Sequence, residues 1–317
     1  MSTFPRRFAR VAASCVALGA AALSGIAHGA SESDAVAPAV ILVKGAWPSA
    51  TDAMTSVPEG GAISSNAYGS AYFGLTYPFG LDWTQRYEGP PPSDSGYYVL
   101  AQIEPSNRSR NSNLGHVLIA AQDMFFTLAP ANNAFELLSF YKDHLGAEYE
   151  VDRSPTAIRI ANRDFVRLDY RSSAAGLHWR VLATEIRCHV VQFVFTGHST
   201  KALERLTQDM NGARLALETS YPICVKDYAT PENLIEREDP VFPEPRFNPV
   251  PVRIVIDREG KVKHAHFLSA FPEQARRISD ALSQWRFKPY LLNGQPVEVE
   301  TGLAFGRSPR PNISALQ

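Results

Sequence analysis

The sequence predicts an α+β protein of two domains: a larger antiparallel sheet with two helices, then a small ββαββ domain. Three observations carry this prediction. The chain has 317 residues, and one ordinary domain holds roughly 100–200. Strand-length apolar runs are interspersed with two segments of helical spacing up to about residue 217. A proline-rich stretch then separates them from a second, shorter set of strands around one helix.

The larger domain is expected over residues 67–220, and its strands are read from short apolar runs bounded by turn residues. We expect strands at residues 72–78, 97–103 and 116–122, and three more within Ala157–Tyr170, Leu177–Arg187 and His189–Thr196. Residues 190–195 are apolar on both faces, which suits a central strand.

Two helices are expected in the same domain. The first carries its apolar residues at spacings of three, three and four, which places them on one helix face: Phe135, Leu138, Tyr141 and Leu145. Asn132 or Asn133 would cap it, and Gly146 would end it. A second helix, capped by Thr200, would bury Leu203, Leu206, Met210 and Ala213.

Residues 221–250 are expected to be an acidic linker. Its density of prolines prevents a regular helix and keeps the chain extended. Six acidic residues lie between Asp227 and Glu244. We therefore expect the two domains to move independently about this linker.

The small domain is expected over residues 251–306. Val252, Ile254 and Ile256 alternate with Arg253 and Asp257, which predicts a strand. A tight turn at residues 257–260 leads to a second strand, and Pro272 opens a helix. Asn293-Gly294 is a hairpin signal. The last strand would run over 297–305.

The ends of the chain are expected to lie outside the folded part. Residues 1–30 combine arginines, a short apolar run and small residues before a polar segment, as a signal peptide does. The alternative is an uncleaved membrane anchor. Residues 31–66 would form an irregular leader and residues 307–317 a disordered tail. Export permits a disulfide between Cys188 and Cys224, although two separate thiols are the alternative.

Three segments of the small domain carry a resemblance to a known family: Val255–Val262, Trp285–Tyr290 and Asn293–Val297. They resemble the C-terminal domain of TonB, the periplasmic energy transducer, over residues 241–306. Trp285 would anchor the helix on the sheet, Pro289 would end the connection, and Asn293 and Gly294 would fix the register of the hairpin. The family's usual first helix has no counterpart among the prolines before residue 250.

The larger domain shows a second resemblance. Tyr72–Pro78 and Phe165–Tyr170 make residues 67–217 similar to PsbP-like α/β/α domains. That resemblance implies a domain that binds partners or assists assembly rather than one that catalyses a reaction.

No catalytic, cofactor-binding or metal-binding residue is predicted. The sequence lacks the common hydrolase, zinc-protease, P-loop and dinucleotide motifs. His264 and His266 would share a strand face, but two exposed histidines without a metal are the better interpretation. Cys188 and His189 are strand neighbours and would point to opposite faces. A net charge of −1 gives no reason to expect nucleic-acid binding.

We therefore expect a non-enzymatic periplasmic binding protein. Its last strand and hairpin would accept a partner's extended segment as an added strand. The candidate partner-binding residues are Val297, Val299, Thr301, Leu303, Arg286 and Tyr290. A basic cluster of Arg276, Arg277 and Arg286 is either a solvated face or a contact for an acidic peptide.

The TonB resemblance implies an outer-membrane transporter as the partner, and another envelope protein is the broader expectation. Two alternatives remain. One is an inner-membrane-anchored, TonB-like energy transducer, which requires that the first segment stays uncleaved. The other is an enzyme with a pocket in the larger domain.

Overall fold

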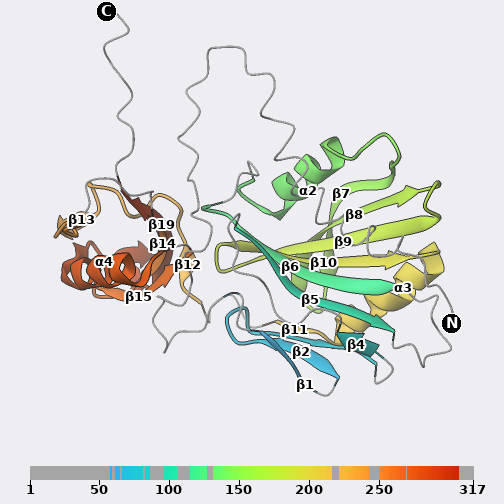
Figure 1. Ribbon diagram of the computed structural model, residues 1–317, viewed down its shortest axis with the longest axis horizontal. Coiled ribbons are helices and arrows are strands. Elements are labelled where there is room, and N and C mark those ends of the chain that lie inside the picture. The colour runs from blue at the N-terminus through green and yellow to red at the C-terminus, as the bar shows by residue number, and fades with distance from the viewer. Residues whose placement is uncertain are drawn as a thin grey trace, which may run out of the picture.

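The computed structural model describes residues 58, 61–64, 66–80, 83–85, 96–105, 115–126, 131–215, 221–242, 250–268 and 270–306. Within these ranges the fold is mixed α/β and mostly sheet. Figure 1 shows a larger part, residues 61–215, beside a smaller part, residues 221–306. The predicted signal peptide at 1–30 and the predicted tail at 307–317 lie outside the described residues, as does most of the predicted leader.

A seven-stranded antiparallel sheet forms the centre of the larger part. Its order is β4-β5-β6-β10-β9-β8-β7. The strands span Trp83–Gln85 (β4), Tyr97–Pro105 (β5), His116–Asp123 (β6), Glu150–Ile160 (β7), Arg163–Ser172 (β8), Leu177–Ile186 (β9) and His189–Gly197 (β10). Every residue of β10 is buried, so the prediction of a central strand at residues 190–195 is confirmed.

The prediction of a single strand within residues 157–170 was wrong. Two strands, β7 and β8, meet there in a hairpin whose turn residues Ala161 and Asn162 have φ of 47° and 64°. β7 is an edge strand, largely exposed, and it contains Pro155. An edge strand in water needs no apolar alternation, so the hydrophobic pattern did not reveal it.

A second sheet covers one face of the first. It has the order β1-β2-β3-β11 over Ala62–Ser64, Ala67–Ser70, Leu75–Pro78 and Arg214–Leu215. Strand β1 lies within residues 31–66, which were predicted to be an irregular leader. That prediction is wrong for residues 62–64, because they pair with β2. The strand expected at 72–78 begins only at Leu75, because Tyr72 lies in the turn before it.

The helices lie on opposite faces of the seven-stranded sheet. Helix α2, Ala134–Asp143, is capped by Asn133, as expected, and packs on one face with Leu137 and Leu138. Helix α3, Thr200–Gln208, is continued by the 3₁₀ turn Asp209–Gly212 and packs on the other face beside the second sheet. Its cap is Ser199 rather than the predicted Thr200.

The smaller part is a four-stranded sheet with one helix on one face. The sheet order is β12-β19-β14-β15, over Ile223–Cys224, Val299–Phe305, Val250–Ile256 and Val262–Phe267. Helix α4, Pro272–Gln284, has the predicted proline in its first turn. Two short pairs complete it: β13 (Leu234–Glu236) with β16 (Arg286–Phe287), and β17 (Tyr290–Leu292) with β18 (Gln295–Val297).

One prediction about this part needs correction. The last strand is not continuous over 297–305: Val297 pairs with Tyr290 in the hairpin, and β19 begins at Val299. Although the polar Arg253 alternates with apolar residues, every residue of β14 is buried. Its second face packs against the larger part, which is a contact that a local pattern cannot show.

The predicted linker is part of the structure at its described residues, 221–242. Strand β12 pairs in parallel with β19, and β13 pairs with β16. Tyr228 is buried among the side chains of the smaller part. The prediction of a freely extended linker is therefore wrong for this segment. Its backbone is hydrogen-bonded to strands of the smaller part, and its Tyr228 side chain packs in the core of that part.

Candidate functional site

The predicted partner-binding residues fall into two groups. Val299, Thr301 and Leu303 lie on β19, which is hydrogen-bonded to β14 on one side. On the other side β12 pairs with Val299 and Glu300, and the Thr301 hydroxyl donates to the Lys226 carbonyl at 3.1 Å. The expected open edge along β19 was thus wrong over 299–301, where a segment of the same chain occupies it.

The second group surrounds the hairpin β17–β18. Val297 and Tyr290 are cross-strand partners at its base. Tyr290 is half-buried and packs edge-on against Tyr228, with ring centroids 5.4 Å apart. Arg286 lies on β16 and donates to the carbonyls of Ser283 and Trp285. The structure therefore brings Val297 and Tyr290 together, and places Arg286 on a neighbouring strand pair.

The four residues predicted as structural lie between the end of α4 and the hairpin turn. The Trp285 indole N–H donates to the Glu238 carbonyl at 2.7 Å, and the ring lies 5.7 Å from that of Phe305. Pro289 stands between β16 and β17. Asn293 and Gly294 form the hairpin turn, with φ of 51° and 79°. Both central residues thus have the positive φ that a type I′ turn needs.

The hairpin presents an outward backbone edge. Leu292 and Gln295 flank the two-residue turn as the hydrogen-bonded pair, so the next pair, Leu291 with Pro296, is a non-hydrogen-bonded one. Pro296 has no N–H, which fits that position. The N–H and carbonyl of Leu291 consequently point away from β18. Its side chain is 59% exposed and that of Leu292 is 44% exposed.

A buried cluster of charged and polar side chains joins the two parts, and no sequence signal revealed it. We call it the interface cluster, and its members are Tyr72, Asp123, Arg187, His189, Arg253 and Glu300. Arg253 on β14 is 2% exposed and forms an ion pair with Asp123, at the end of β6. It also lies 2.9 Å from His189 Nε2 and donates to the Tyr72 hydroxyl at 2.7 Å. Burial alone would lower the pKa of Arg253, but Tyr72 and Glu300 hold it above the usual value.

Glu300 on β19 completes this interface cluster. It accepts hydrogen bonds from the Tyr72 hydroxyl at 2.8 Å and from Arg187 Nε at 3.1 Å. Arg187 stacks over the Tyr72 ring at 3.9 Å. Burial is the main reason that the pKa of Tyr72 lies well above its ordinary value. Two arginines and two carboxylates therefore compensate one another within the interface.

The predicted disulfide between Cys188 and Cys224 is present. Cys188 lies in the tight turn between β9 and β10, with a φ of 58°, and is 1% exposed. Cys224 is half-buried on β12. The bond therefore ties a turn of the larger part to the strand that lies on β19.

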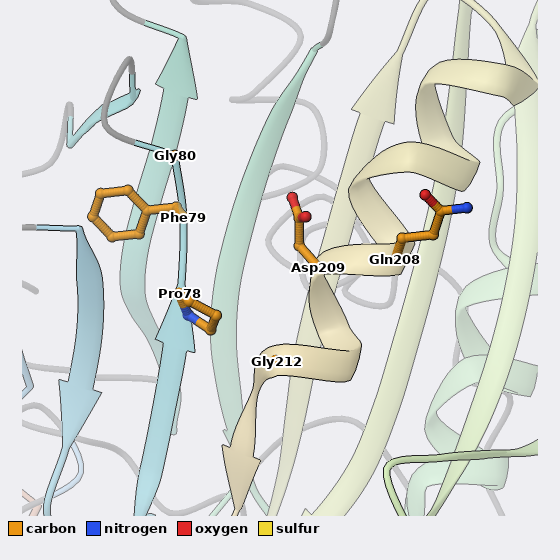
Figure 2. Close-up of a pocket in the computed structure, with 6 residues that line it drawn as sticks. All are labelled: Pro78, Phe79, Gly80, Gln208, Asp209 and Gly212. Atoms are coloured by element: carbon orange, nitrogen blue, oxygen red, sulfur yellow. The ribbon is translucent and has the colours of Figure 1, made fainter.

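A shallow hollow of about 290 Å³ lies beside the end of β3. Figure 2 shows Pro78, Phe79 and Gly80 on one side and Gln208, Asp209 and Gly212 on the other, with the Asp209 carboxylate between them. Burial raises the pKa of Asp209, and the nearby Arg205 partly opposes this. One carboxyl group without a base, nucleophile or second acid beside it gives this hollow no recognisable catalytic arrangement.

The remaining candidates have local partners. Arg276 and Arg277 both pair with Glu273 on the exposed side of α4. His264 and His266 lie on β15. Among the described residues, no group of three or more His, Cys, Asp and Glu side chains could hold a metal ion. No helix in the described ranges is long and apolar enough to cross a membrane.

Comparison with known proteins gives only distant similarity. No family model matches the chain, and no curated protein matches it. The solution structure of cyanobacterial PsbP (CyanoP) from Synechocystis sp. PCC 6803 is similar at 13% identity and a TM-score of 0.34. The match covers 49% of this chain and 95% of that one.

A crystal structure from Bacteroides thetaiotaomicron is similar at 11% identity and a TM-score of 0.27. That match covers 47% of this chain, which spans about half (47%) of the Bacteroides chain.

Proposed function

We propose that this is an exported, non-enzymatic binding protein of the cell envelope. Its smaller part would take up an extended segment of a partner as an added strand. The observation that carries the proposal is the hairpin β17–β18, which offers an outward backbone edge at Leu291 beside two exposed leucines. Strand addition uses such an edge for affinity and the alternate side chains for specificity.

The distribution of exposed apolar side chains supports binding by the smaller part. Among the described residues, large hydrophobic side chains that face water lie mainly in the smaller part: Ile235, Val241, Phe271, Leu291 and Leu292. The larger part contributes only Phe135 and Val151 to this set. Exposed apolar groups gathered on one part of a protein are typical of an interaction surface.

The preformed turn supports binding at the hairpin as well. Asn293 and Gly294 already hold their positive φ angles, so the edge strand needs little ordering when a partner arrives. By contrast, the long edge strand β7 carries Pro155, charged residues and shifts in register. Those are the features by which natural edge strands avoid pairing.

The partner class follows from the resemblance of residues 241–306 to the TonB C-terminal domain. We propose an outer-membrane transporter, or another envelope protein with an extended periplasmic segment. The signal-peptide pattern of residues 1–30 would deliver the protein to the periplasm.

The test compares two substitutions at Leu291 in the full chain. Leu291→Ala removes the side chain only, whereas Leu291→Pro also removes the outward N–H. Strand addition predicts that capture of outer-membrane proteins from a detergent extract falls severalfold with alanine and at least a further tenfold with proline. The same pair of substitutions at Val151 on β7 serves as the control and should leave capture unchanged.

Unfolding in urea would first establish that the variants keep the stability of the wild type to within about 1 kcal/mol, as surface substitutions generally do. Equal losses for alanine and proline would show that the leucine side chain, rather than the strand edge, makes the contact. Capture unaffected by either substitution would refute the hairpin as the binding site.

A further inference from the structure

We propose that strand β12 is a displaceable cover over a second strand-acceptor edge, on β19, and that the Cys188–Cys224 disulfide locks this cover. The inference rests on the proposed binding by strand addition and adds a redox control to it. The sequence analysis predicted this edge of the last strand as the partner-binding edge. In the structure, β12 of the same chain pairs with it.

The contacts of β12 show that β19 accepts an extended segment on this side. The Ile223 N–H donates to the Glu298 carbonyl at 2.8 Å, and the Val225 N–H donates to the Glu300 carbonyl at 3.1 Å. The pairing is parallel and covers only Val299 and Glu300. A partner strand in the same place would form the same backbone bonds and could extend them along β19.

The cover itself is weak. It is a strand of two residues, Ile223–Cys224, and both side chains are only half-buried. The pairing covers only two residues of β19, and one side-chain bond, from the Thr301 hydroxyl to the Lys226 carbonyl, lies beside it. Isolated pairings of this length are not stable in water without further support, so a covalent tie is the natural source of that support.

The disulfide supplies the tie, and it does so from the larger part. Cys188 is fixed in a tight turn and buried beside the interface cluster, where its sulfur lies 3.6 Å from the Glu300 carbonyl. This anchor cannot follow β12 outward, because Arg187 next to it is held by Glu300. While the bond is intact, β12 therefore stays on β19.

A dithiol reductant of the envelope would open the lock. One thiolate attacks the half-buried Cys224 sulfur, the S–S bond breaks, and a mixed disulfide forms. The second thiolate of the reductant then displaces Cys224 and closes the reductant's own disulfide. Two electrons and two protons pass to the protein, which leaves Cys188 and Cys224 as thiols and β12 free to leave.

While the disulfide is reduced, the interface cluster keeps the larger part and the smaller part together. Arg253, Asp123, Glu300 and Arg187 form their ion pairs without using the disulfide. Reduction should consequently open one strand rather than separate the larger part from the smaller part.

Amide hydrogen exchange on the full chain tests this lock without any partner. We expect the Ile223 and Val225 amides to exchange at least tenfold faster after reduction with dithiothreitol, and equally in Cys224→Ser. The amide of Ile254 on central strand β14 is the internal control and should not change. Unchanged exchange at 223 and 225, or acceleration that includes Ile254, would overturn the proposal.

A peptide of residues 221–227 with serine at position 224 tests the opened edge. The double variant Ile223→Pro, Cys224→Ser cannot rebuild its own cover, so it should bind this peptide at least tenfold more tightly than the oxidised wild type. Equal binding would overturn the inference. Failure here with a normal Leu291→Pro effect would refute the lock alone, and the reverse result would refute the hairpin site alone.

Discussion

Asp169 on β8 shows how individual side chains stabilise the larger part. The carboxylate accepts hydrogen bonds from Arg167 and from the buried Arg180. Burial alone would raise the pKa of Asp169, but the two arginines outweigh it and hold the pKa below the ordinary value of 3.8. A carboxyl group with a lowered folded pKa stabilises the protein above its unfolded pKa, and this contribution is lost as the pH falls.

Asp169→Asn should therefore destabilise the protein at pH 7 by about 1.5–3 kcal/mol, the range for hydrogen bonds to charged groups. The difference from wild type should shrink as the pH falls below 3.8, because the unfolded wild-type carboxyl takes up a proton there and the folded one does so only at its lower pKa. Urea unfolding at pH 7 and pH 3 measures both. Asp164→Asn is the control, since its pair with Arg159 is largely exposed and should contribute little.

At the scale of elements, two turns of the smaller part need glycine for different physical reasons. Gly260 closes the turn between β14 and β15 with a φ of 82°, and an added Cβ would lie 2.0 Å from the Phe287 carbonyl oxygen. Gly294 in the hairpin turn has a similar φ of 79° but open space around it. Conformation alone restricts Gly294, whereas Gly260 also permits the close approach of β16.

Gly294→Ala should accordingly cost about 1–2 kcal/mol of folding free energy, the price of a left-handed residue with a Cβ. Gly260→Ala should cost about 3 kcal/mol or more, because the backbone must also move. Chemical denaturation of the two variants in parallel compares them. Similar losses would mean that the β14–β15 turn yields to the methyl group without disturbing β16.

Most elements could be predicted from the sequence because their signals are local. The Pro272 helix start, the Asn293-Gly294 turn and the central strand around residue 193 each depend on residues within one element. Strand β7 escaped prediction because an exposed edge strand buries no stripe of apolar residues. Strand β12 escaped it because only its partner strand and a distant cysteine keep a segment so short in place.

For the whole molecule, the interface cluster determines how the two parts are held. Tyr72 and Glu300 are separated by 228 positions in sequence, yet they share a buried hydrogen bond. No periodicity connects such positions, so the burial of Arg253 could not be predicted from the sequence. The candidate hairpin, by contrast, was predictable, because its turn and exposed leucines are adjacent in sequence.

Arg253→Met should destabilise the whole molecule by about 3–5 kcal/mol, because Asp123 would remain buried without its arginine and Glu300 would keep only Arg187. Adding Asp123→Asn to this variant should recover part of the loss, as expected for groups that interact directly. Arg258→Met, on an exposed turn, is the matched control. Additive effects of the two substitutions in urea unfolding would contradict a direct pairing across the interface.

The same cluster limits how this chain can evolve. A recombination event that joined the larger part to a different C-terminal segment would have to bring an arginine and a glutamate at the places of Arg253 and Glu300. It would also have to retain a cysteine opposite Cys188. We therefore expect the two parts to be inherited together and homologues to change these positions as a set.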